Sequence, residues 1–190
     1  MPTWAGDSER RDGRGAVTKY NVQPTGRERT FGRDEIIVSK TDLKGRITYC
    51  NVVFRRIAGF SESELLGQPH SIIRHPDMPR CVFKLLWDTI EAKGEIFAYV
   101  KNMARNGDHY WVLAHVTPSL DRDGRIVGYH SNRRLPNPTT VAAVERLYAD
   151  LKAIEDKPDN RKDGMTNAFD HLVGLLQSKG ISYDQFVLSL

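Results

Sequence analysis

The turn Arg105-Asn106-Gly107-Asp108 limits the possible folds of this chain more than any other feature, because it separates two strand-like runs. Residues 96–102 and 109–117 flank the turn, and Asn-Gly tolerates the positive φ angles that a tight hairpin requires. A second turn at residues 121–124 leads into a third run at 126–132. Since short turns place successive strands side by side, the sequence predicts three neighbouring antiparallel strands.

A shorter hairpin is expected earlier in the chain. Residues 36–38 and 47–50 form two strand-like runs, and the residues between them, 41–45, have the composition of a turn. Together with the three later strands, this hairpin predicts a sheet of five antiparallel strands.

Short helices are predicted between the hairpin and the later strands. Asn51 suits a helix N-cap, and Ser61 with Glu64 forms a capping box, in which each side chain bonds a backbone N–H at the start of the helix. Pro79 opens a longer helix, residues 79–93, with apolar residues along one side. Because a sheet with one apolar face must bury that face, we expect an α+β fold with the helices on one face of the five-stranded sheet.

The two ends of the chain have a different character. Residues 1–30 are polar and lack apolar periodicity, so they cannot bury enough surface to offset the entropy of ordering. Pro136-Asn137-Pro138 ends the strand pattern, and amphipathic helices are predicted after it. We therefore expect a flexible polar tail over residues 1–30, one domain over residues 31–135, and a C-terminal helical extension over residues 136–190.

Composition excludes several classes of protein. The net charge is +4, but basic and acidic residues are interspersed without a basic stripe, so no nucleic-acid partner is expected. No apolar run approaches the roughly 20 residues of a membrane span, and residues 1–15 do not form a signal peptide, which predicts a cytoplasmic chain without a membrane span. Cys50 and Cys81 form no metal or CxxC motif. Since no nucleophile elbow, metal-spaced cluster or phosphate loop occurs either, the chain is not expected to be an enzyme.

Three segments carry a specific resemblance. They are "KTDLKGRITYCN" at residues 40–51, "AGFSESELLGQPHSIIRHPDMP" at residues 58–79 and "KNMARNGDHYW" at residues 101–111. In their residue patterns and spacing, the three segments resemble the PAS domain of the aerotaxis-receptor family. This resemblance implies a PAS fold over residues 31–135, a pocket that binds FAD, and a sensor of redox state or oxygen that signals to a chemotaxis or other signalling protein. It also implies a homodimer, with the C-terminal extension serving output or dimerisation.

The resemblance implies six flavin-contacting residues: Asn51, Arg74, His75, Asp77, Trp87 and Asn102. Their chemistry fits this role, because arginine pairs with phosphate through two hydrogen bonds and asparagine offers a donor and an acceptor to a ring edge. Structural roles stay open beside this one. Asp77 suits the N-cap of the helix that Pro79 opens, and Asn51 suits a cap. Trp87 lies in an apolar stripe typical of a core, and Asn102 comes near the end of a strand.

Two other functions remain open at this stage. A PAS domain that binds haem as a gas sensor needs an axial ligand such as histidine, and His115 alternates with Ala114 and Val116 and suits either face of its strand. A ligand-free module for protein interaction or dimerisation is the other alternative. A blue-light sensor is not expected, because related light-oxygen-voltage domains use a cysteine beside the flavin, and the corresponding residues 69–77 contain none.

Overall fold

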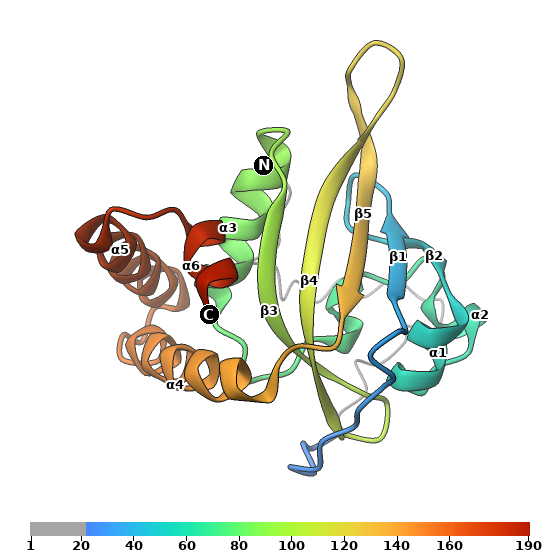
Figure 1. Cartoon of the computed structure of the whole chain (residues 1–190), viewed down its shortest axis with the longest axis horizontal. Helices are drawn as coiled ribbons and strands as arrows, with labels where there is room; N and C mark the ends of the chain where they lie inside the picture. The colour runs from blue at the N-terminus through green and yellow to red at the C-terminus, as the bar shows by residue number, and fades with distance from the viewer. Residues whose placement is uncertain (1–21) are drawn as a thin grey trace.

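A five-stranded antiparallel sheet forms the centre of the protein (Figure 1). The computed structural model describes residues 22–190. The strands are β1 (Ile37–Thr41), β2 (Ile47–Cys50), β3 (Ile96–Met103), β4 (His109–Leu120) and β5 (Ile126–Arg134), and their order across the sheet is β2-β1-β5-β4-β3. All neighbouring strands pair antiparallel. The first and the last strand in the sequence, β1 and β5, are neighbours in the sheet. The predicted sheet is therefore confirmed, with the later strands one to three residues longer than expected.

Short helices cover one face of this sheet, as predicted. They are α1 (Val52–Ala58), α2 (Glu62–Leu65), a 3-10 helix η1 (His70–Ile73) and α3 (Arg80–Glu91). Both expected caps form: the Asn51 side chain accepts a hydrogen bond from the Phe54 N–H, and Ser61 and Glu64 make the reciprocal capping box. The helix α3 ends earlier than predicted, and Lys93, with φ of 66°, takes the left-handed position.

Three further helices pack beside the sheet rather than extending away from it (Figure 1). They are α4 (Pro138–Glu155), α5 (Arg161–Lys179) and α6 (Tyr183–Ser189). The helix α5 begins at Arg161, because the Asn160 side chain accepts a hydrogen bond from the Lys162 N–H and caps the helix there. Leu151 and Leu172 are fully buried in the same apolar core as the sheet residues, so the helices and the sheet share one core.

The C-terminal helices cover the free edge of β3. Tyr148 of α4 donates its hydroxyl to the Tyr99 carbonyl oxygen at 2.7 Å, and Asp184 of α6 accepts the Phe97 N–H at 2.8 Å. The Met78 sulfur accepts the Lys101 N–H at 3.2 Å. Every second residue of this edge thus has a partner outside the sheet. An unpaired strand edge is a template for aggregation, and these contacts close it.

Part of the expected N-terminal tail contacts the domain. The Thr25 N–H bonds the Gly107 carbonyl at 3.0 Å, and the Arg29 N–H bonds the His109 carbonyl at 2.7 Å. Residues 1–21, the remainder of the expected tail, lie outside the described residues. Within residues 22–190, no helix combines the length and the apolar character needed to cross a bilayer.

Candidate functional site

A cavity lies between the inner face of the sheet and the helices η1 and α3. It leaves about 740 Å³ between protein atoms, counting the space at its open mouth. Its wall is mostly apolar, with a few polar groups from the sheet and from η1. The lining residues are Ser39, Thr41, Gly45, His70, Ser71, Arg74, Phe83, Leu86, Trp87, Ile90, Val100, Asn102, Ala114, Val116, Tyr129, His130, Ser131 and Arg133.

Aromatic side chains form one side of the cavity. The Trp87 ring of α3 meets the Tyr129 ring of β5 edge to face, with 5.0 Å between ring centroids. The Arg74 guanidinium lies 4.2 Å from the centroid of the Phe83 ring, close enough for a cation–π contact. A flat ring bound in this cavity would therefore meet aromatic and aliphatic surface on the α3 side.

Arg133 places a buried positive charge at the cavity. Its residue surface is 2% exposed, and its guanidinium donates hydrogen bonds to the hydroxyls of Ser39 and Ser131. The Nη1 nitrogen is buried and has no hydrogen-bond partner, and no carboxylate pairs with the guanidinium among residues 22–190. Burial lowers the pKa of Arg133 to about 10. A buried cation without an anion is costly, so this residue marks a place where a ligand could supply acceptors.

His70 lies beside Arg133 and stays neutral. Its Nε2 is 3.1 Å from the Ser39 hydroxyl, and its ring stacks on Phe54 at 5.9 Å between centroids. Burial, and then the charge of Arg133, lowers the pKa of His70 to about 3. His70 therefore carries no charge near pH 7, and Arg133 remains the buried charge of this group.

Three of the six predicted contact residues line the cavity: Arg74, Trp87 and Asn102. Arg74 and Asn102 also form an isolated antiparallel bridge between the end of η1 and β3. The Asn102 side chain is buried, and its Nδ2 has no hydrogen-bond partner among residues 22–190. Burial lowers the pKa of Arg74 to about 10. The cavity thus holds two unused buried donors, on Asn102 and Arg133.

Asn51 lies elsewhere and uses its whole side chain in structural contacts. Its Oδ1 accepts the N–H groups of Phe54 at 3.0 Å and Val38 at 3.1 Å, and its Nδ2 donates to the Ile36 carbonyl at 2.7 Å. Asn51 therefore caps α1, which is the structural role that the sequence left open for it, and connects this helix to β1.

His75 and Asp77 also lie away from the cavity lining. The buried His75 ring accepts the Asp77 N–H at its Nδ1, over 3.2 Å, and burial lowers the pKa of His75 to about 4. The exposed Asp77 carboxylate accepts a hydrogen bond from Lys101 at 3.0 Å. The alternative in which Asp77 caps α3 is wrong, because Pro79 is the N-cap and the Cys81 N–H of the first turn bonds Glu155.

Sequence reasoning missed a polar group at the cavity: Ser39, Ser131 and Arg133 on the sheet, and His70 on η1. The predicted last strand ended at Asn132, which left Arg133 outside it. Strand alternation held the missing signal, because Tyr129, Ser131 and Arg133 occupy every second position and share one face.

Histidine and cysteine positions bear on the alternative ligands. His115 points away from the cavity, since its neighbours Ala114 and Val116 line it, and His115 bonds Glu95 at 2.7 Å. His70 and His130 line the cavity. Neither buried cysteine belongs to the lining.

Comparison with known proteins agrees with this geometry. Residues 47–133 match the family model described as PAS fold. The chain is 46% identical over 121 residues to the aerotaxis receptor of Escherichia coli strain K12, which is 63% of this chain and 24% of the relative. It is 30% identical over 135 residues to the nitrogen fixation regulatory protein of Klebsiella pneumoniae, covering 64% of this chain and 27% of the relative. The chain thus spans about a quarter of the length of these curated relatives.

A solved light-oxygen-voltage domain, studied with a flavin analogue, has the same fold. It superposes with a TM-score of 0.54 at 16% identity, over 59% of this chain and 85% of the other. At this identity the likeness concerns the fold alone.

Proposed function

We propose that this chain, which carries a PAS domain over residues 47–133, is a cytoplasmic sensor that binds FAD and reports redox state or oxygen to a signalling partner. In this proposal residues 31–135 are the sensory domain, and residues 136–190 are the extension for output or dimerisation. The chain senses and does not catalyse. A chemotaxis protein is the proposed class of partner, in keeping with the similarity to an aerotaxis receptor, and the working form is a homodimer.

The observation that carries the proposal is the buried Arg133 with its unused Nη1. In an apolar cavity a cation without an anion is retained at a cost to stability, so a ligand with electron-rich acceptors accounts for it better than packing does. Asn102 adds a second buried donor without a partner in the described part of the chain. Two unused donors beside aromatic walls fit a flat ring that presents oxygen and nitrogen acceptors along one edge.

The chain's own residues would bind and orient such a ring. Arg133 and Asn102 would donate to its polar edge, while Trp87, Tyr129 and Phe83, which also line the cavity, would exclude water. Bound flavin supplies one- and two-electron redox chemistry and gains negative charge on its ring when it is reduced. Since Arg133 is a fixed positive charge in a medium of low polarity, it interacts differently with the two forms. A sensor requires such a difference, because a ligand shifts a conformation only by its unequal affinity for two states.

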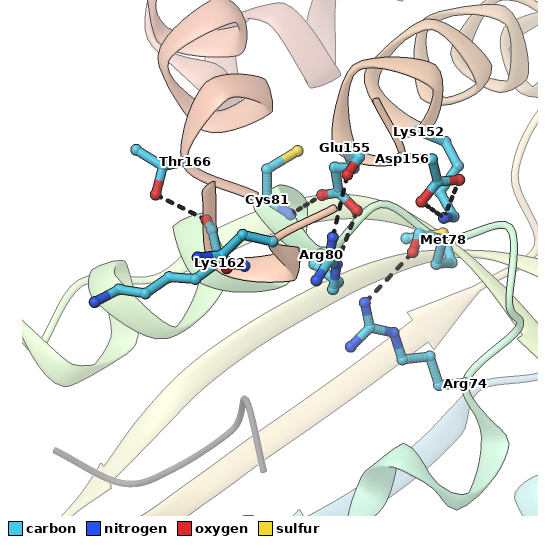
Figure 2. Close-up of polar contacts among 10 residues, drawn as sticks. Arg74, Met78, Arg80, Cys81, Lys152, Glu155, Asp156, Lys162 and Thr166 are labelled. Carbon is cyan, nitrogen blue, oxygen red and sulfur yellow. Dashed lines mark hydrogen bonds and ion pairs between the residues drawn. The ribbon is translucent and has the colours of Figure 1, made fainter. Parts of the chain in front are cut away.

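Arg74 offers a second cation at the cavity wall, from the end of η1. Its guanidinium reaches Phe83 and the Met78 carbonyl oxygen, the latter at 3.4 Å, rather than a carboxylate (Figure 2). An arginine in this state remains able to pair with a phosphate, and FAD carries a diphosphate. We therefore assign Arg74 to the phosphate part of the ligand and Arg133 to the ring.

The absorption spectrum of the purified full chain tests the proposal. Flavin bands, with FAD identified by chromatography of the ligand released on heating, are the expected result. A Soret band would replace FAD by haem, and a colourless protein that takes up no added FAD would leave a ligand-free interaction module. Either of these two outcomes contradicts the proposed function.

A further inference from the structure

Glu155 is a buried carboxylate outside the cavity lining. It is the last residue of α4, and its side chain has no exposed surface. Its Oε1 accepts the Cys81 N–H at 2.7 Å, and its Oε2 lies 3.2 Å from the Arg80 Nε (Figure 2). A buried charge is tolerated only where it is paired and hydrogen-bonded, and Glu155 finds both partners in the first turn of α3.

The first turn of α3 has no other side-chain cap. Its N-cap is Pro79, which offers no side-chain acceptor, and no acidic residue lies in the turn. Negative charge at the start of a helix stabilises the helix through its unpaired N–H groups and its dipole. Glu155 therefore supplies from α4 what the sequence of α3 lacks.

The other side of α3 forms the cavity wall. Phe83, Leu86, Trp87 and Ile90 all line the cavity, and all lie within the three turns that start at the capped end. The cavity residue Arg74 also reaches this end, since it donates to the carbonyl oxygen of Met78, two residues before α3. A shift of α3 would therefore change both the shape of the cavity and the contacts of Glu155.

The same carboxylate stands at the junction of α4 and α5. Gly164 of α5 packs so closely on the Glu155 backbone that a methyl group there would overlap the Glu155 carbonyl oxygen. Further along, the Lys84 ammonium of α3 lies 4.8 Å from the centroid of the Phe169 ring of α5. Movement of Glu155 would thus move α4 and α5 together against α3.

We infer that Glu155 is a positioning residue that links the cavity to the C-terminal helices by holding the first turn of α3, so that a change of ligand state alters how firmly α4 and α5 dock. This link deepens the proposed function, because it rests on the cavity being the sensing site. Thermodynamic coupling is reciprocal: if docking of α4 and α5 favours one state of the cavity, then that state favours docking by the same factor.

Labelling of the two cysteines measures, without any ligand, how firmly Glu155 holds the first turn of α3. Cys81 is fully buried in the first turn of α3, and burial, followed by the charge of Glu155, raises the pKa of its thiol to about 12. A thiol reagent therefore reaches it only when this junction opens. Cys50, on β2, is buried away from Glu155 and serves as an internal control, with each labelled site read by mass spectrometry.

The expected result is a rise of at least tenfold in the labelling rate of Cys81 in Glu155→Gln, with the rate of Cys50 unchanged. Arg80→Gln, which removes only the charged partner, should give a smaller rise in the same direction. Asp156→Asn is the matched control, because the only salt bridge of this exposed neighbour within residues 22–190 is to Lys152, so both rates should stay as in the wild type. An unchanged Cys81 rate, or an equal rise for both cysteines, overturns the inference.

Hydrogen exchange with and without FAD then measures the coupling, which a merely structural contact would not produce. In the wild type, FAD should slow exchange in β5 and in α5. In Glu155→Gln, FAD should still slow exchange in β5, but most of the slowing in α5 should be lost. Equal protection of α5 in both proteins overturns the inference. If the wild type takes up no FAD, the proposed function fails, and Cys81 labelling alone decides the role of Glu155.

Discussion

Replacing Arg133 by methionine separates a ligand-binding role from a structural one. The lowered pKa of Arg133, from 12.5 to about 10, corresponds to a penalty of about 3 kcal/mol for its charge in the folded state. Methionine removes this penalty. It also removes two hydrogen bonds from a charged donor to hydroxyls, each worth about 1.5–3 kcal/mol, and a cation–π contact with Phe54 worth about 1 kcal/mol. The gain offsets much of the loss, so the free energy of unfolding of the ligand-free protein should fall by about 1–4 kcal/mol.

Flavin affinity should respond very differently to the same substitution. A hydrogen bond from a charged donor contributes about 1.5–3 kcal/mol, which predicts a ten- to hundredfold weaker binding of FAD. Urea unfolding of the ligand-free protein and fluorescence titration with FAD give the two quantities. Arg134→Met is the matched control, since Arg134 is exposed on the opposite face of the same strand. Unchanged affinity with a loss of more than about 4 kcal/mol in stability would refute the reasoning, because Arg133 would then serve the fold.

Three further predictions concern stability, each measured by urea unfolding. Tyr148→Phe should cost about 1–3 kcal/mol, because the Tyr99 carbonyl oxygen loses its buried donor; a change below about 0.5 kcal/mol would contradict this. Gly164→Ala should cost about 1–3 kcal/mol through overlap with Glu155, whereas Gly174→Ala, in open space on the same helix, should be neutral or stabilising; equal effects would contradict the packing. Stability should fall between pH 6.5 and pH 5, because the unfolded chain protonates His70 while the folded chain, where its pKa is about 3, does not. His70→Gln should remove about 2 kcal/mol of this fall, and an unchanged pH dependence would contradict it.

The sheet and its helices were predictable because their signals are local. The Asn106-Gly107 turn, the capping box at Ser61 and the alternation of the strands each depend on a few neighbouring residues. Helix ends were less accurate where packing decides them. At the end of α3, Gly94 packs so closely on Thr89 that an added Cβ would lie 3.0 Å from the Thr89 side chain. The residue with positive φ at this helix end is Lys93.

The candidate site was only partly predictable. Residues that the family resemblance named divide into those on the cavity, such as Trp87 and Asn102, and those with structural contacts, such as Asn51. Arg133 was not predicted as a site residue, because the expected strand ended one residue before it. Glu155 escaped for a different reason, since its partners Arg80 and Cys81 lie about 75 residues away along the chain, and no local pattern records such a contact.

Hydrogen exchange of the FAD-loaded chain in its oxidised and chemically reduced forms, compared without oxygen, tests the central claim most directly. If Arg133 meets the charge that reduction adds, exchange should differ between the two forms in β5 around this residue, and the difference should vanish in Arg133→Met. Identical exchange in both redox forms of a protein with bound FAD would contradict the account, because the cavity would then hold the ligand without reporting its state.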